Sequence, residues 1–221
     1  MIRRAALLAP ALALALSFDR RPAQAPPAQF SPDDVARAMR ALPARDEGRF
    51  GRPGDPLNLV FFGDAAAIEA ALEAAGWSRV PGSTAQSLAE GLEDLWLARP
   101  LARFPPMNSY RTMGRFQDMN WARPIRAIES RHHFRLWRTG IVDGRGRELW
   151  WGSGNLDLFV RWSDLSHTPD PDMDAERDFI AASLKGKASL AWQALPQIPL
   201  EGVNDKGYAF RTDGRVLIVG L

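Results

Sequence analysis

The chain has 221 residues, of which 46% are hydrophobic and 10% aromatic, enough apolar surface for one substantial core. This composition argues against a chain that is disordered throughout. The chain contains no cysteine, so disulfides, thiolate nucleophiles and cysteine metal ligands are excluded.

The first 25 residues have the pattern of an export signal. Arg3 and Arg4 give a basic start, an apolar run of about 14 residues continues to Phe18, and Ala23-Gln24-Ala25 suits a cleavage site. The run is shorter than the roughly 20 residues that span a bilayer, although an uncleaved membrane anchor is the alternative. The sequence thus predicts a signal peptide over residues 1–25 and a periplasmic or secreted protein.

The positive charge is concentrated in this segment. The formal net charge of the whole chain is +2, and cleavage after Ala25 would remove four of the 28 basic residues but only one of the 26 acidic residues. The remainder lacks the basic excess expected of a nucleic-acid-binding protein. Nucleic acid is therefore not an expected partner.

Residues 26–50 are predicted to be a linker that includes one short helix, from about Pro32 to Leu42. Ser31 is a suitable N-cap, and Pro32 suits the first helical turn. A compact domain is expected over residues 51–221.

This domain should begin with a central strand. Residues 57–62 form a largely apolar run, and Asp64 can cap the alanine-rich helix that follows up to Ala75. A second helix is predicted over residues 83–97, and residues 99–128 should be irregular with short strands.

The strongest hairpin signal is Asp143-Gly144-Arg145-Gly146, which lies between aromatic-rich strands predicted over residues 131–139 and 148–162. Each flank is long enough to reach across a sheet.

The C-terminal part is predicted to contain a helix over residues 169–184, a strand over 189–193 and a final hairpin over 208–221 that turns at Asp213-Gly214. Strands outnumber helices, and the strict βαβ alternation of a parallel sheet is absent. The predicted class is therefore α+β, with a mixed or antiparallel sheet and helices packed on it.

Two adjacent histidines lie in the strand predicted over residues 131–139. Successive side chains of a strand point to opposite faces, so one face carries Arg131, His133, Arg135 and Trp137, and the other carries His132, Phe134 and Leu136. The first face could bind an anion, and imidazole is a common metal ligand and acid–base group. The alternative is that His132 is a hydrogen-bonded core residue and that the arginines pair with carboxylates.

An acidic segment begins at Asp170. Asp170 could cap the predicted helix, with Pro171 in the first turn. Asp174 and Asp178 are four residues apart and share a helix face, with Arg177 beside them. This spacing could serve a metal, a proton-transfer pair or an ion-pair network.

A mixed histidine and carboxylate site is a further hypothesis. His133, His167 and Asp174 could together bind zinc or manganese, which makes a divalent metal a candidate cofactor. The long separation of these residues along the chain carries no specificity by itself.

Several separated motifs, in a consistent order, resemble the LssY C-terminal domain family. They include Gly51-Arg52-Pro53-Gly54-Asp55-Pro56, Gly114-Arg115-Phe116-Gln117-Asp118, the Arg131 to Trp137 strand, the Asp170 to Asp178 segment and Thr212-Asp213-Gly214-Arg215. The resemblance covers about residues 50 to 221 and implies an envelope module that is often joined to membrane proteins. The functional residues that it implies are Arg131, His132, His133, Arg135, Asp157, His167, Asp172, Asp174, Glu176, Arg177 and Asp178.

Three functions remain open on these grounds. The first is an accessory module that binds an anionic lipid or glycan of the cell envelope through Arg131, Arg135 and His133. The resemblance adds to this ligand-binding set the residues His132, Asp157, Asp172, Glu176 and Arg177. The second is a hydrolase, metal-dependent in one form, whose catalytic residues would be His133, His167, Asp174 and Asp178. The third is a structural partner of a membrane protein.

Overall fold

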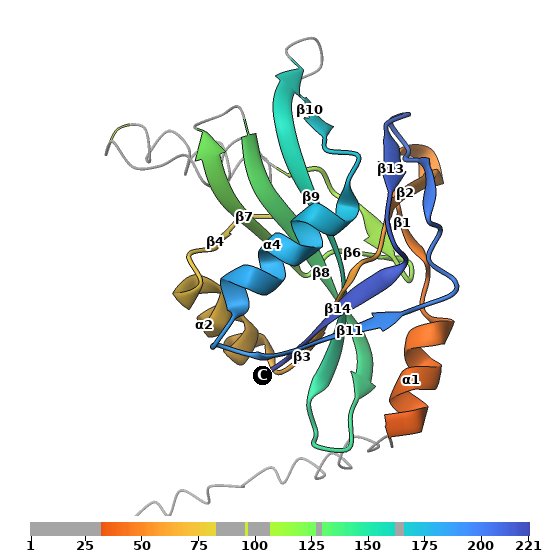
Figure 1. The fold of residues 1–221 in the computed structure, drawn as a ribbon, viewed down its shortest axis with the longest axis vertical. Helices are drawn as coiled ribbons and strands as arrows, with labels where there is room; N and C mark the ends of the chain where they lie inside the picture. The colour runs from red at the N-terminus through yellow and green to blue at the C-terminus, as the bar shows by residue number, and fades with distance from the viewer. Residues whose placement is uncertain (1–31, 83–95, 97–106, 127–129, 162–165) are drawn as a thin grey trace, which may run out of the picture.

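The computed structural model describes residues 32–82, 96, 107–126, 130–161 and 166–221 (Figure 1). The predicted signal peptide, the start of the linker and nearly all of the helix predicted over residues 83–97 lie outside these ranges. Within them, no helix has the length and apolar character needed to cross a membrane.

A mixed sheet forms the centre of the molecule, in the strand order β11-β14-β3-β9-β8-β7-β4, with β10 paired to β9. The β14 strand runs parallel to β3, whereas β9 pairs antiparallel with β3, β8 and β10. The strands are β3 (Leu59–Phe62), β4 (Ser78–Arg79), β7 (Met119–Arg126), β8 (Ser130–Val142), β9 (Glu148–Arg161), β10 (Ser166–Pro169), β11 (Ser189–Ala194) and β14 (Arg215–Gly220).

Two small sheets lie beside the large one. One has the order β2-β1-β5-β6 and the other pairs β12 with β13. Their strands are β1 (Arg45–Glu47), β2 (Pro53–Pro56), β5 (Arg111–Thr112), β6 (Arg115–Phe116), β12 (Glu201–Val203) and β13 (Ala209–Arg211), and the helices are α1 (Pro32–Ala41), the 3-10 turn η1 (Arg49–Gly51), α2 (Ala65–Ala74) and α4 (Met173–Leu184). The α+β class and the mixed sheet are confirmed.

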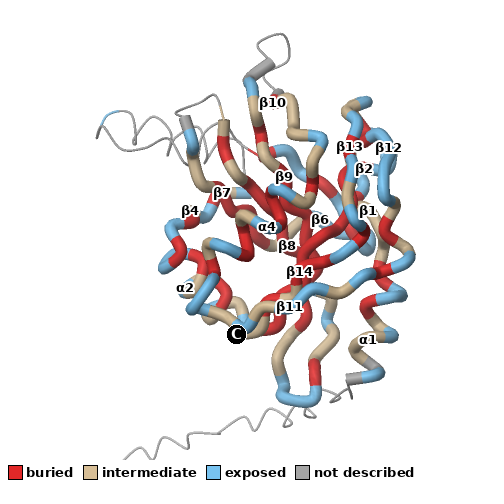
Figure 2. The backbone as a smooth tube through the Cα atoms, viewed as in Figure 1, coloured by how far each residue is buried: buried red, intermediate tan, exposed pale blue. Residues whose placement is uncertain are grey.

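Both faces of the central strands are buried, as Figure 2 shows. In β3, Leu59 and Phe61 pack with α2 and α4, whereas Val60 and Phe62 belong to a second cluster with Met39 of α1. Burial on both faces explains why this strand is continuously apolar rather than alternating. Each such side chain contributes about 1.5–3 kcal/mol relative to exposure.

The local signals for three elements are confirmed. The α1 helix begins at Pro32, and the Asp64 side chain caps α2 by accepting a hydrogen bond of 2.7 Å from the Ala67 N–H. The predicted hairpin forms as β8 and β9. Gly154 of β9 then lets α4 approach the sheet, because a Cβ at this position would lie 2.8 Å from Ile180 Cδ1.

The start of α4 differs from the sequence-based expectation. The helix predicted from residue 169 begins at Met173, because the Asp172 carboxylate accepts hydrogen bonds from the Asp174 and Ala175 N–H groups and so caps it. Asp170 instead accepts a hydrogen bond from the Asp172 N–H, before the helix. His167 lies before this segment, on the strand β10.

The predicted final hairpin is wrong. A turn does occur at Asp213-Gly214, but β13 pairs with β12, whereas β14 pairs with β11 and β3. The apolar residues of β14 are buried in the centre of the large sheet, and this burial outweighs the local preference for a hairpin. The region predicted to be irregular likewise contributes the eight-residue strand β7.

Candidate functional site

The alternation predicted along β8 is confirmed. Arg131, His133 and Arg135 line a polar cavity on one face of the strand. On the other face, Phe134 and Leu136 belong to the core beneath α2 and α4. The strand therefore separates a hydrophobic layer from a polar one.

The cavity has a volume of about 50 Å³, room for a few water molecules or one small polar group. Its lining comes from β2, β8, β9, β10, the segment before β5 and the connection between β12 and β13. The lining residues are almost all polar: Asp55, Asn108, Tyr110, Arg131, His133, Arg135, Asn155, Asp157, His167, Pro169, Asn204, Lys206 and Tyr208.

Asp157 is the centre of the histidine-containing part of the cavity. Antiparallel pairing of β8 with β9 sets Arg131 opposite Asp157, and β10 folds back on β9 to bring in His167. One carboxylate oxygen, Oδ2, lies 3.3 Å from Arg131 Nε, 3.3 Å from His133 Nδ1 and 3.6 Å from His167 Nδ1. Two histidines that are 34 positions apart in the chain thus share a single carboxylate.

Burial and charge set the protonation of this group. Burial would raise the pKa of Asp157, yet the surrounding imidazole and guanidinium groups, His133 and Arg131 foremost, hold it below its usual value. Burial and the nearby arginines lower the pKa of His133 to about 3, although Asp157 opposes the shift. At neutral pH the site therefore holds a charged carboxylate beside a neutral His133 imidazole.

Arg135 is a buried cation without a carboxylate in contact. The residue is only 4% exposed. Its Nε donates a hydrogen bond of 3.2 Å to the Asn108 carbonyl, and its guanidinium carbon lies 4.5 Å from the centre of the Tyr110 ring. Across the parts of the chain that the structure describes, its Nη1 and Nη2 groups have no protein acceptor. Donors that lack a protein acceptor inside a polar cavity can bind a ligand.

Lys206, which is half-buried, adds a second cation. Its amine lies 5.9 Å from the centre of the same Tyr110 ring and forms no ion pair with a described carboxylate. Burial, reinforced by Arg135, lowers the pKa of Lys206. An anion between Lys206 and Arg135 would relieve the repulsion between them.

The acidic groups near these cations already have partners. Asp55 accepts a hydrogen bond of 3.0 Å from Asn204 Nδ2, and Asp205 accepts one of 2.9 Å from the Tyr110 hydroxyl. Burial and the charge of Asp55 raise the pKa of Asp46 well above its usual value. Of these three carboxyl groups, Asp55 lines the cavity.

His132 and Glu176 lie behind the cavity, on the helix side of β8. His132 Nδ1 is 2.5 Å from Glu176 Oε2, and the imidazole stacks on Phe179 with ring centres 3.5 Å apart. Burial and Arg123 lower the pKa of His132 to about 4, and burial and Asp157 raise the pKa of Glu176. As the alternative interpretation expects, the partly buried His132 is held by Glu176 and Arg131 pairs with Asp157, whereas Arg135 has no described carboxylate in contact.

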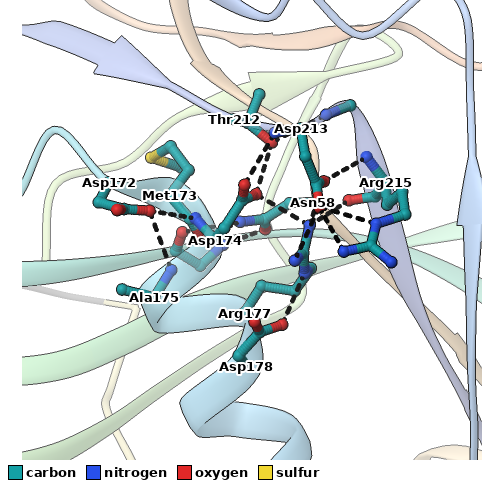
Figure 3. A network of polar contacts seen from close by, with 12 residues as sticks. Asn58, Asp172, Met173, Asp174, Ala175, Arg177, Asp178, Thr212, Asp213 and Arg215 are labelled. Atoms are coloured by element: carbon teal, nitrogen blue, oxygen red, sulfur yellow. Dashed lines mark hydrogen bonds and ion pairs between the residues drawn. The ribbon is translucent and has the colours of Figure 1, made fainter.

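The remaining predicted site residues form a separate network around Arg177 (Figure 3). Arg177, whose side chain is 1% exposed, bonds Asp174 at 2.8 Å, Asp178 at 3.0 Å and Asp213 at 2.6 Å. Asp172 caps α4 and pairs with Arg211 at 2.8 Å. Asp174 and Asp178 thus form the ion-pair network that their spacing allows, whereas the helix cap is Asp172 and not Asp170 as predicted.

The structure therefore divides the predicted site residues into three groups, which are the cavity lining, the His132–Glu176 pair behind it and the network around Arg177. His133 and His167 meet at Asp157, but Asp174 and Asp178 bind Arg177 and do not line the cavity. The expected metal ligands His133, His167 and Asp174 are thus not brought together. In the described ranges, no set of three or more histidine, aspartate and glutamate side chains is arranged to hold a metal ion.

Several cavity residues were missed from the sequence: Asn108, Tyr110, Asn155, Asn204, Lys206 and Tyr208. Most of them lie in connections that no periodic pattern identifies. Asp55 had a signal, because it belongs to the first of the motifs that resemble the family.

Comparison with known proteins gives one match. The family model described as LssY C-terminus matches residues 39–216, a range that contains every residue of the cavity. No curated protein and no solved structure matches the chain.

Proposed function

Because this chain belongs to the LssY C-terminus family and places two cations without carboxylate partners in one polar cavity, we propose that it binds a small anionic group there. The predicted export signal supports a ligand of the cell envelope, such as the phosphate or carboxylate of a lipid or glycan. The cavity is the recognition site for that group.

The observation that carries this proposal is the guanidinium of Arg135. A buried cation without a bonded counter-charge is costly, and a phosphate or carboxylate would supply acceptors for its donors. The Lys206 amine adds a donor to the Nη1 and Nη2 groups of Arg135, and it comes from another part of the chain. Asn108 and Asn155 line the cavity with neutral polar side chains.

The test is calorimetric titration of the full chain with inorganic phosphate and glycerol phosphate. We expect saturable binding that weakens about tenfold or more in Arg135→Gln, because hydrogen bonds to charged groups contribute about 1.5–3 kcal/mol each. Arg211→Gln is the matched control, since Arg211 is an exposed arginine of the other network. Absence of saturable binding, or equal affinity in Arg135→Gln, would refute the proposal.

A hydrolase is the second candidate, and the shared Asp157 favours it. The Asp157 carboxylate lies 3.3 Å from His133 Nδ1 and 3.6 Å from His167 Nδ1, and a carboxylate beside an imidazole is a recurrent arrangement in general acid–base catalysis. Because its pKa is lowered to about 3, His133 is a weak base, so this candidate ranks below binding. In a hydrolase without a metal ion, His133 and His167 would be the acid–base groups that act on a bound phosphoester. Asp174 and Asp178 have no part in it, because they bind Arg177.

The hydrolase candidate is tested with a chromogenic phosphate monoester, with and without zinc or manganese. Turnover that disappears in both His133→Asn and His167→Asn would establish it. Binding of the ester without turnover under every condition would leave the binding function alone.

A further inference from the structure

The turn between β1 and β2 holds an aromatic side chain out into solvent. Phe50 is 94% exposed and has φ 58°, followed by Gly51 with φ 70°. A left-handed backbone is unfavourable for a bulky residue and persists only where the surroundings impose it. An exposed phenylalanine therefore occupies a position that glycine or asparagine would fill at lower cost.

Contacts with the connection between β12 and β13 fix this turn. Asp205 Oδ2 accepts a hydrogen bond of 2.9 Å from the Arg49 N–H, and Gly48 packs so closely that a Cβ there would lie 2.2 Å from Asp205 Cγ. Arg45 Nη2 donates to the Val203 carbonyl at 2.6 Å. Figure 1 shows the β1–β2 turn beside β13 at one end of the molecule.

The same connection joins the turn to the cavity. Lys206 and Asn204 line both the cavity and a surface hollow that is also lined by Arg52, Pro53 and Val203. The Phe50 turn is thus next to the rim of the anion-binding cavity.

Two exposed arginines flank Phe50 on a surface of mixed charge. Arg49 and Arg52 are exposed on either side, and neither forms an ion pair with a described carboxylate. Val203, 59% exposed, extends the apolar part, and the exposed acids Glu47 and Glu201 lie on neighbouring strands.

We propose that this turn docks on a bilayer that contains anionic lipid. Phe50 enters the headgroup region, Arg49 and Arg52 contact lipid phosphates, and the adjacent cavity receives the phosphate of a lipid headgroup. The last step rests on the proposed function of the cavity.

Size and charge favour a bilayer over a protein partner. A stable protein interface buries about 1,200–2,000 Å², far more than one aromatic side chain and its neighbours supply. An aromatic ring flanked by arginines matches the headgroup layer, where rings insert and basic side chains are attracted to anionic lipids.

The absence of cysteine allows a direct test on the full chain. A fluorophore on Phe50→Cys is compared with one on Met113→Cys, using vesicles that carry a nitroxide lipid quencher. Met113 is a matched control: it also has positive φ, 53°, and is 38% exposed, but it lies in the β5–β6 turn. Because β5 runs antiparallel to β1, this turn is at the opposite end of the small sheet.

We expect quenching at position 50 with vesicles of phosphatidylcholine and phosphatidylglycerol, weak quenching with phosphatidylcholine alone, and none at position 113. Equal quenching at the two positions, or none at position 50, would overturn the docking proposal. Equal quenching at position 50 with both lipid mixtures would overturn the role of the arginines.

A second pair of variants separates docking from the cavity. Asparagine tolerates positive φ, so Phe50→Asn and Met113→Asn should both fold. We expect about tenfold weaker binding to anionic vesicles for Phe50→Asn only, with unchanged affinity for glycerol phosphate. Unchanged vesicle binding in Phe50→Asn would overturn docking and leave the cavity proposal intact. If Arg135→Gln alone loses glycerol phosphate binding, the anion-binding proposal for the cavity is supported. The docking proposal is then decided by the vesicle binding of Phe50→Asn.

Discussion

Arg177 and Arg135 are both buried arginines, but they differ in their hydrogen-bond and ion-pair partners. Arg177 has three aspartates and the Arg215 carbonyl within hydrogen-bonding distance. Arg135 has one carbonyl and an aromatic ring among the described residues. A cation whose donors are all engaged stabilises the fold, whereas one with donors left over is suited to a ligand.

The difference lies in the partners, not in the arginines. Asp213 reaches Arg177 from the turn before β14, and its pKa is held below the usual range by hydrogen bonds from Arg177 and Arg215, which outweigh the effect of burial. Around Arg135, Asp55 and Asp205 already accept hydrogen bonds from other side chains, and burial raises the pKa of Asp46 well above its usual value. The contrast predicts which substitutions will affect stability and which will affect binding.

The largest effect is expected for Arg177→Met. Removing the guanidinium leaves Asp174 and Asp178 without this counter-charge, although Asp213 keeps its pair with Arg215, and breaking an ion-pair network around a buried arginine costs about 3 kcal/mol or more. Urea denaturation measures the change in the free energy of unfolding. A loss below about 1 kcal/mol would show that this network does not hold α4 to β14.

The next effect concerns His133 and pH. The unfolded imidazole binds a proton near its usual pKa of 6.5, whereas the folded one does so only near 3, so acidification favours the unfolded chain. The His133 contribution to stability should fall by about 2 kcal/mol between pH 7 and pH 5.

The measurement is the difference between the wild type and His133→Asn across this pH range. Both proteins retain His132 and Glu176, whose own titrations then cancel. Parallel stability curves for the two proteins would contradict the neutral, buried state of His133.

Arg135→Gln should change stability little. It loses one hydrogen bond and its contact with the Tyr110 ring but no bonded carboxylate, so we expect a change within about 1 kcal/mol. Thermal melting compared with phosphate titration checks this. Strong destabilisation would mean that Arg135, like Arg177, stabilises the fold.

The smallest effect is expected for Arg211→Gln. Arg211 pairs with Asp172, but its side chain is 64% exposed, and exposed ion pairs contribute about 0–1 kcal/mol. Urea denaturation should detect little change, and phosphate affinity should be unaltered. A large loss would mean that the cap of α4 depends on this pair.

Local signals identified much of the fold. The Asp64 cap, the β8–β9 hairpin and the alternation of Arg131, His133 and Arg135 were all predicted correctly. The final hairpin was not, because the centre of the sheet offered β14 more apolar contact than β13 could.

The candidate site was identified only in part. The sequence selected His133, His167 and Asp157, but it gave equal standing to Asp174, Asp178 and Arg177. Cap and ion-pair patterns on a helix have the same spacing as a catalytic acid cluster, so sequence could not separate the two.

By itself, the sequence determined the α+β class and the two faces of β8, because alternation, caps and turns act between residues close in the chain. The ordered motifs of the sequence also identified the family. Only the tertiary structure decided that β10 brings His167 to Asp157, that the β12–β13 connection brings Lys206 to Arg135, and that Asp213 closes on Arg177. These contacts depend on strand pairing between distant segments, and the pairing is set by burial of the whole sheet.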